Sequence, residues 1–369
     1  DAWDGSFSRP PVVEWTERLP GPVYPAAGHS ERGRPVLHGD RIYVGSAADD
    51  GLLVLDRRDG ALLDRLPAGG AVQAAPLVDE ERVLFTDSAG NTWCYALEGG
   101  PALWSHFSGA PILAPPTVHE SVVFVHNVDN LVYALDAETG DLLWRHEQKL
   151  DVSRSSVLEL FAAPEPIVAG SWVVTGHSDG TVVALEQQTG EVAWQRRVGE
   201  GQYPDLVAPP LVIESEGLLI VGGYVEPLVA LGLDDQQVRW RIDTGAYQAP
   251  VFVDGVIYQG GIDGLLRAIE PDTGELIWTW DSETAGALTK PVVTDAGLLL
   301  GSTEGALFLV DAQTGEETWT LEPGLLVEGI TVPPAVEGRQ AVALTNAGRL
   351  WSLVVPPTVT EDRAKGPWR

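Results

Sequence analysis

A proline precedes a short apolar segment at eight nearly regular points along this chain of 369 residues. The eight positions are Pro35, Pro76, Pro116, Pro166, Pro210, Pro250, Pro291 and Pro334. Consecutive prolines lie about 43 residues apart, and the period covers the whole chain. Such a period predicts one structural unit stacked on itself. The chain is therefore predicted to form a single domain, although its length alone would suggest two or three.

Each unit predicts four short strands and two hairpin turns. In the third unit, apolar and β-branched residues mark strands at 116–118, 121–125, 131–136 and 141–144. The turns between the third and fourth strands end in glycine, which adopts the positive φ of a hairpin turn at little cost. Two hairpins make a four-stranded antiparallel sheet. Eight such sheets cover one another when arranged radially, so the fold class is all-β, an eight-bladed β-propeller.

Six of the prolines are followed by a tryptophan at a nearly constant distance. Trp104, Trp144, Trp194, Trp278 and Trp319 each lie 28 residues after a proline, and Trp240 lies 30 after. These positions fall on the fourth, outer strand, where a large ring is expected to fill the gap between blades. Two copies depart from the pattern, because Asp64 replaces a tryptophan and Gln236 replaces a turn glycine.

The repeat also predicts how the ring closes. The eighth tryptophan is due near residue 362, but Asp362 stands there within a polar tail. The segment 12–19 has the pattern of a fourth strand, including Trp15, with no blade before it. We therefore expect the N-terminal strand to complete the C-terminal blade and remove a free edge. The propeller is predicted to span residues 1–357, with a disordered tail at 358–369.

Composition narrows the classes of partner. A net charge of −30 argues against nucleic acids and anionic membrane surfaces as partners, since both are bound through lysine and arginine. The chain has no methionine, which indicates a processed start, and no apolar run long enough to span a membrane. The single cysteine, Cys94, is expected to be a buried, inert thiol.

No motif of known chemistry stands out. The seven histidines form no metal-ligand spacing, although His126 and His177 occupy comparable positions near the ends of second strands. A metal site at that pair is the less favoured interpretation. The acidic turns lack the ligand ladder of a calcium loop. We therefore predict no catalytic, cofactor or metal site.

The repeated Ala-Leu-Asp-x-x-Thr-Gly-x-x-x-Trp core resembles the pyrroloquinoline-quinone (PQQ) type propeller repeat. It is clearest at residues 131–144, 181–194, 266–278 and 307–319. Quinoprotein alcohol dehydrogenases carry this repeat and use a vicinal cysteine disulfide and a calcium ion. With one cysteine, this chain cannot build that disulfide.

In size and layout the chain resembles the BamB family of outer-membrane assembly lipoproteins. Leu158 and Leu160 match the leucines of the family's docking loop, and Phe161 stands at the position of its arginine. Asp205 matches the first aspartate of the next loop, and Val207 replaces the second. The resemblance implies a partner-binding site formed by Leu158, Glu159, Leu160, Phe161 and Asp205.

Loop lengths point independently to the same place. From a tryptophan to the next proline takes 10 to 15 residues in ordinary units, but 22 after Trp144 and 16 after Trp194. Equivalent connections of a propeller emerge on one face, and enlarged loops on a rigid scaffold commonly bind partners. The alternative is that the apolar residues of 148–163 fold back and cap blades 3 and 4.

The resemblance therefore implies a non-catalytic periplasmic scaffold at the outer membrane that docks the POTRA domains of a BamA-like insertase. It also implies a monomer within a larger complex, with a lipid anchor at its processed N-terminus. Two alternatives remain open from the sequence. One is a PQQ-dependent quinoprotein oxidoreductase, and the other is a ligand-sensing propeller domain.

Overall fold

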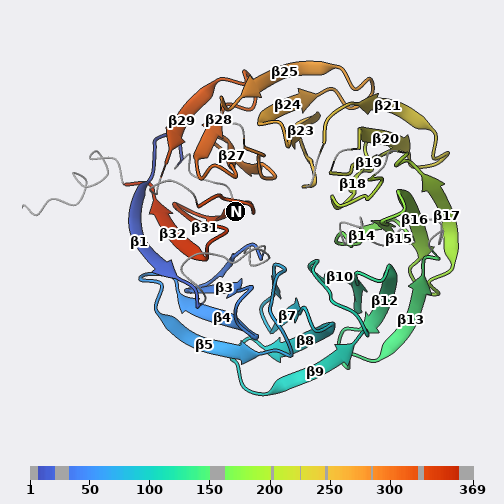
Figure 1. Ribbon diagram of the computed structural model, residues 1–369, viewed down its shortest axis with the longest axis horizontal. Coiled ribbons are helices and arrows are strands. Elements are labelled where there is room, and N and C mark those ends of the chain that lie inside the picture. Colours follow the sequence, from blue (N-terminus) through green and yellow to red (C-terminus); the bar gives the residue numbers. More distant parts are fainter. Residues whose placement is uncertain are drawn as a thin grey trace, which may run out of the picture.

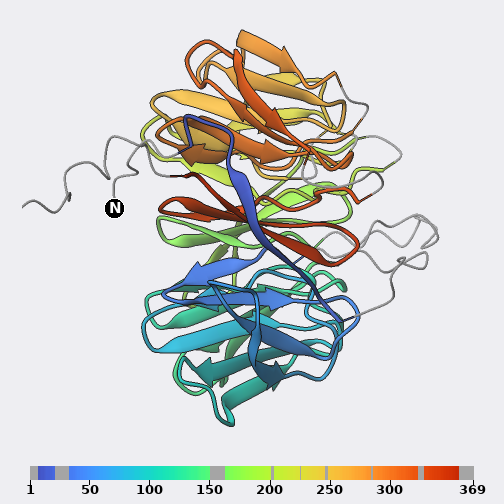
Figure 2. The same ribbon diagram turned by 90° about the vertical axis from the view of Figure 1, so that its left-hand side faces the viewer.

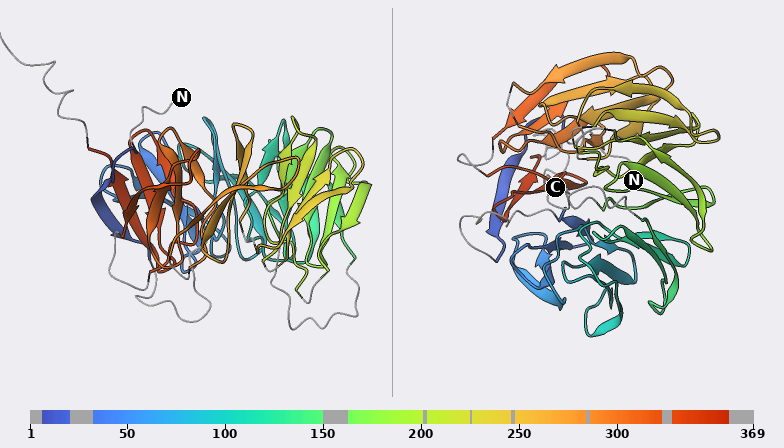
Figure 3. Two further views of the ribbon diagram at one scale, coloured as in Figure 1. Left: turned by 90° about the horizontal axis from the view of Figure 1, so that it is seen from above. Right: turned by 45° about the vertical axis from the view of Figure 1, so that its right-hand side comes forward.

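Eight four-stranded antiparallel sheets form a closed ring in the computed structural model (Figure 1). The structure describes residues 7–20, 33–149, 163–200, 203–224, 226–245, 248–283, 286–322 and 328–356. The ring is a short cylinder when seen from its side (Figure 3). The predicted eight-bladed β-propeller is therefore confirmed. No helix in the described ranges is long and apolar enough to cross a membrane.

Blades 1 to 4 follow the order of the chain. Their strands are β2 (Val36–His38), β3 (Arg41–Gly45), β4 (Gly51–Asp56) and β5 (Leu62–Pro67); β6 (Leu77–Val78), β7 (Arg82–Thr86), β8 (Asn91–Ala96) and β9 (Ala102–Phe107); β10 (Thr117–His119), β11 (Val122–His126), β12 (Leu131–Asp136) and β13 (Leu142–Glu147); and β14 (Ile167–Ala169), β15 (Trp172–Gly176), β16 (Thr181–Glu186) and β17 (Val192–Arg197).

Blades 5 to 8 continue the pattern until the last strand. Their strands are β18 (Leu211–Ile213), β19 (Leu218–Val221), β20 (Leu228–Gly232) and β21 (Val238–Ile242); β22 (Val251–Val253), β23 (Val256–Gly260), β24 (Leu265–Ile269) and β25 (Leu276–Asp281); β26 (Val292–Thr294), β27 (Gly297–Gly301), β28 (Leu307–Val310) and β29 (Glu317–Leu321); and β30 (Ala335–Glu337), β31 (Gln340–Leu344), β32 (Arg349–Val354) and β1 (Val12–Arg18).

In each blade the first strand lies nearest the axis and the fourth lies at the rim (Figure 1). Because successive strands are antiparallel, the turns between strands 2 and 3 share one face with the linkers between blades. We call this the linker face. The turns between strands 1 and 2 and between strands 3 and 4 lie on the opposite face.

The hydrophobic core lies between neighbouring blades. One cluster joins Val174 and Val182 of blade 4 to Leu219 and Leu231 of blade 5, and all four are almost fully buried. Equivalent clusters recur around the ring, including one that joins Leu344 of blade 8 to Ile42 of blade 1. Each sheet thus buries both faces against its neighbours, which is why the repeated strands are apolar on both sides.

The tryptophans pack between blades as predicted. A Cβ atom added at Gly140, in the outer turn of blade 3, would lie 2.5 Å from the Trp104 ring of blade 2. The indole N–H groups of Trp104 and Trp144 donate to the carbonyls of Ala137 and Gln187, at 3.2 and 2.7 Å. The turn glycine therefore has two roles: it takes a positive φ, 74° at Gly140, and it leaves room for the ring.

The N-terminal strand closes the ring. β1 pairs with β32 along its length, from Val12 opposite Val354 to Arg18 opposite Arg349. In Figure 2, β1 runs in blue beside the red strands of blade 8. Trp15 supplies the missing eighth tryptophan, because its indole N–H donates to the Arg57 carbonyl of blade 1 at 3.2 Å. This prediction is confirmed. The predicted tail, 358–369, lies outside the described residues.

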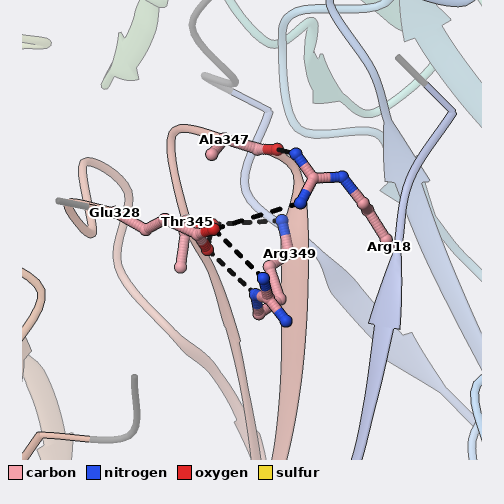
Figure 4. A network of polar contacts seen from close by, with 5 residues as sticks. All are labelled: Arg18, Glu328, Thr345, Ala347 and Arg349. Carbon is pink, nitrogen blue, oxygen red and sulfur yellow. Dashed lines mark hydrogen bonds and ion pairs between the residues drawn. The ribbon is translucent and has the colours of Figure 1, made fainter. Parts of the chain in front are cut away.

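A polar network on the linker face holds the closing strand (Figure 4). Glu328 accepts two hydrogen bonds from Arg349, at 3.0 and 3.2 Å, and lies 4.0 Å from Arg18 of β1. Arg18 also donates to the carbonyl of Ala347 at 3.3 Å. The bidentate contact with Arg349 lowers the pKa of Glu328. The first and last strands of the chain are thus joined by charge as well as by the ladder.

Candidate functional site

The predicted docking loop lies only partly within the described residues. Leu158, Glu159, Leu160 and Phe161 fall outside them, so their role in binding stays a prediction. The residues on either side of the loop are described, and they show how its two ends are attached to blades 3 and 4. Asp205, the fifth predicted residue, is also described.

Both ends of the linker between blades 3 and 4 are fixed to polar groups of those blades. At its start, the backbone N–H of Gln148 donates to the carbonyl of Asn130 at 3.1 Å. At its end, the carbonyl of Pro164 accepts a hydrogen bond from the Thr175 hydroxyl at 3.4 Å and lies 3.3 Å from Nδ1 of His126. The linker therefore leaves from and returns to a fixed base.

That base is a buried polar cluster formed by His126, Asn130, Thr175, His177 and Ser178, which we call the blade 3–4 platform. The rings of His126 and His177 meet edge to face with centroids 4.9 Å apart. The Asn130 side chain joins the two blades, since its Oδ1 accepts from the Ser178 backbone N–H at 3.1 Å and lies 3.2 Å from Nδ1 of His177. All five side chains are almost fully buried.

Burial keeps the platform neutral. Burial lowers the pKa of His126 to about 4, and it lowers the pKa of His177 well below its usual range. His146, on β13, adds to both shifts as a like charge. The Nε2 atoms of these three rings are buried with no hydrogen-bond partner among the described residues. No group of three or more potential ligand side chains in the described ranges is arranged to hold a metal ion.

The linker after blade 4 rests on the same platform. The backbone N–H of Leu206 donates to the carbonyl of His177 at 3.3 Å. Leu206 packs closely against Gly176, where an added Cβ would lie 2.6 Å from the leucine Cβ. The neighbouring Asp205 is fully buried, with an exposed fraction of 0%. Because it is buried, Asp205 could influence binding only by fixing the conformation of its loop. Its role in binding stays a prediction.

Sequence reasoning singled out His126 and His177 but missed what they do. The two positions differ by one residue within the blade repeat, so only the ring geometry shows that their side chains meet. The sequence did hold a signal at Asn130, which is an asparagine where other blades have a turn glycine. In the structure Asn130 has a φ of 60°. Asparagine tolerates that conformation and can hydrogen-bond from it.

A second polar feature lies at the closing seam. A cleft of about 440 Å³ between blades 8 and 1 is lined by Arg57, Arg58, Arg339 and Glu14 among others. Arg57 is already engaged, because it contacts the Glu337 carboxylate and donates to the carbonyls of Gly39 and Glu337 at 3.0 Å each. The contacts between Arg57 of blade 1 and Glu337 of blade 8 therefore help to close the ring.

The cysteine offers no reactive thiol. Cys94 is fully buried in β8, opposite Trp104, and burial raises its pKa to about 11. The prediction of a buried cysteine is confirmed. A vicinal disulfide needs two cysteines, and this chain has one.

The fold and repeat define a closed eight-bladed β-propeller of the PQQ-repeat class. The family model described as "Outer membrane protein assembly factor BamB" matches residues 13–110, 91–262 and 262–355, which together cover nearly the whole described propeller. The chain belongs to this BamB family.

Individual relatives are distant. The chain is similar to BamB of Yersinia pestis (24% identical over 194 residues, 50% of this chain and 48% of the relative) and of Legionella pneumophila (29% over 205 residues, 54% and 52%). BamB of Moranella endobia is 23% identical over 195 residues. The chain spans about half the length of these curated relatives in the matched regions.

Solved structures support the fold. BamB from Moraxella catarrhalis superposes with a TM-score of 0.76 at 17% identity, over 93% of this chain and 99% of that one. The quinohemoprotein alcohol dehydrogenase ADHIIG from Pseudomonas putida HK5 gives 0.73 at 14% identity, over 95% and 77%. At such identities the likeness concerns the fold alone.

Proposed function

We propose that this protein is a non-catalytic scaffold of the outer-membrane β-barrel assembly machinery, located in the periplasm. Its partner would be the POTRA domains of a BamA-like insertase, docked on the linkers after blades 3 and 4. Membership of the BamB family supports the assembly role. The relatives are outer-membrane protein assembly factors, and this role of theirs motivates the proposal.

The main support for this docking site is that both ends of the linker between blades 3 and 4 are held by hydrogen bonds. The connection from Trp144 to Pro166 is longer than the 10 to 15 residues of the ordinary units, and both its ends are hydrogen-bonded to the blade 3–4 platform. A rigid base under a long loop lowers the conformational entropy lost on binding, because the ends are already fixed. Apolar side chains at Leu158, Leu160 and Phe161 would then supply the buried contact area.

The proposed role requires no covalent chemistry. The scaffold would hold and orient its partner, and a cluster of buried apolar side chains is typical of the hot spots that do so. Each fully buried leucine or phenylalanine would contribute roughly 1.5–3 kcal/mol. The quinoprotein alternative shares only the fold, and turnover of an alcohol on addition of PQQ and calcium would be needed to favour it.

The experiment compares two leucine variants in binding to the purified POTRA segment. Leu160→Asp should weaken binding at least tenfold, roughly 1.4 kcal/mol, while the melting temperature stays nearly unchanged. Leu143→Asp is the matched control, because Leu143 lies on the outer strand of blade 3 and is 52% exposed. It should leave binding intact.

Two outcomes would contradict the proposal. Unchanged binding by Leu160→Asp would remove the docking role of this loop. A large loss of thermal stability in the same variant would favour the alternative in which 148–163 caps blades 3 and 4.

A further inference from the structure

The outer strands of blades 1 to 4 begin with exposed apolar residues. Leu103 is 56% exposed and Leu143 is 52% exposed, although each directly precedes a buried tryptophan. The four strands follow one another along the edge of the ring as β5, β9, β13 and β17 (Figure 1). The exposed large apolar residues at their first two positions are Leu62, Leu63, Leu103, Leu142, Leu143 and Val192. Single exposed leucines are common, but a run of them across neighbouring elements is typical of a binding surface.

The contacts of the tryptophans place these residues beside the outer turn of the next blade. Trp104 of β9 donates its indole N–H to the Ala137 carbonyl in the outer turn of blade 3 at 3.2 Å. Leu103 directly precedes Trp104 and therefore lies next to that turn. Trp144 makes the equivalent contact with blade 4 at 2.7 Å, which places Leu143 next to the outer turn of that blade.

These outer turns carry acidic side chains. Glu98 is exposed in the turn of blade 2, Glu138 and Asp141 in that of blade 3, and Glu191 in that of blade 4. Within the ranges that the structure describes, none of the four forms an ion pair. The cation of β13, Arg145, lies further along the strand toward the linker face. Solvated carboxylates are negatively charged at neutral pH, so apolar and negative groups alternate along the edge of the ring. We name these six apolar and four acidic residues the rim strip.

Arginines occur at both ends of the rim strip. In blade 1 the outer turn carries Arg57 and Arg58, and Arg57 contacts the Glu337 carboxylate of blade 8. In blade 5, Arg239 directly precedes the tryptophan and lies 3.0 Å from Asp235 of the same blade. The unpaired acids and the exposed apolar residues therefore share one sector of the ring.

We propose that the rim strip binds a cationic amphipathic segment of another protein, in which lysine or arginine residues alternate with apolar residues. The leucines supply the area that is buried, and the carboxylates of the turns pair with the cations of the segment. The net charge of −30 attracts any cationic chain, so the exposed leucines decide where the segment binds. The rim strip lies at the face opposite the linker face, so it does not depend on the proposed function.

The test is fluorescence anisotropy of a labelled short peptide of alternating lysine and leucine, titrated with the purified protein. Leu143→Ser should weaken binding about tenfold, because it removes an apolar contact. Glu138→Gln should weaken it about threefold, because an exposed charge pair contributes less. Val293→Ser and Glu304→Gln are the matched controls and should leave the affinity unchanged. Val293 is exposed on β26, the innermost strand of blade 7, and Glu304 is exposed on the linker face.

Two altered peptides check the chemistry of the partner. Serine in place of leucine should weaken binding, and glutamate in place of lysine should abolish it. Equal affinity of the unchanged protein and all four variants would overturn the proposal, because overall charge alone would then hold the peptide. Failure of the unchanged protein to bind the peptide would overturn it as well. Binding to phosphatidylcholine vesicles that Leu143→Ser abolishes, without peptide binding, would instead assign the rim strip to a lipid surface.

Discussion

Gln236, which replaces a turn glycine in blade 5, alters the hydrogen bonding of the neighbouring tryptophan. Trp194 of blade 4 should donate its indole N–H to the outer turn of blade 5, as its counterparts do. In that turn Gln236 replaces glycine at a φ of 54°, and its side-chain amide donates to the Leu233 carbonyl at 2.9 Å. That carbonyl is the equivalent of the acceptor used by Trp104. Nε1 of Trp194 is buried with no hydrogen-bond partner among the described residues.

Gln236→Gly should therefore stabilise the protein. Glycine relieves the positive φ and releases the Leu233 carbonyl for Trp194, and together these should add about 1 kcal/mol to the free energy of unfolding. Urea denaturation at equilibrium measures the change. Gly140→Gln is the reverse control and should destabilise, because its side chain would meet the Trp104 ring. A less stable Gln236→Gly variant would contradict this account.

The other exception is compensated. Asp64 occupies a tryptophan position in blade 1, and a Cβ added at Gly99 of blade 2 would lie 2.9 Å from its carboxylate. The carbonyl that a tryptophan would use, Leu97, instead accepts a hydrogen bond from Arg41 at 3.2 Å. The sequence shows that Asp64 departs from the pattern, but the donor that replaces the tryptophan, Arg41, comes from a different strand and has no spacing signature.

At the scale of elements, the blade 3–4 platform makes stability depend on pH. In the unfolded chain a histidine has a pKa of about 6.5, whereas burial lowers that of His126 to about 4 in the fold. The unfolded state thus binds more protons as the pH falls below about 6.5, and stability is lost down to about pH 4. His126 alone should cost about 2 kcal/mol between pH 7 and pH 5.

His126→Gln should remove that part of the pH dependence. Glutamine keeps an amide that can reach the Pro164 carbonyl but does not titrate. Chemical denaturation at pH 7 and pH 5 should show a smaller fall in stability for the variant than for the unchanged protein, by about 2 kcal/mol. His119→Gln serves as the control because His119 is exposed on β10. Equal falls in all three proteins would contradict this account, because they would show that His126 takes up its proton at nearly the same pKa in the folded and unfolded states.

The blades could be predicted from the sequence, whereas contacts between side chains of different blades could not. The eight repeat prolines predicted every blade, and the turn glycines and outer tryptophans that most blades carry supported the count, because these residues suit the packing where two blades meet. The contact between His126 and His177 depends on how adjacent blades are offset, which no single repeat contains. The burial of Asp205 was not predicted, since a loop residue matched by motif says nothing about the packing of Leu206 beside it.

At the scale of the whole molecule, closure joins residues that are more than three hundred positions apart. Trp319 of blade 7 donates its indole N–H to the carbonyl of Phe7 at 2.9 Å, and Phe7 is fully buried in the same cluster. The N-terminal segment therefore stands in for an outer turn at one seam, and β1 with Trp15 fills the other. The N-terminal segment therefore contacts both neighbours of blade 8: blade 7 through Phe7 and blade 1 through Trp15.

Trp15→Ala should consequently act on the ring as a whole. Its half-buried ring packs against Gly60 and donates to Arg57, so its loss should cost about 2–3 kcal/mol and loosen β1 from β32. A freed edge on β32 invites the β1 strand of a second copy, which would give concentration-dependent dimers. Thermal denaturation and light scattering after size exclusion measure both effects. Trp104→Ala removes an equivalent indole within the continuous chain and should lower the melting temperature but leave the protein monomeric. If both variants dimerise, or neither does, the seam has no special part in keeping the ring closed.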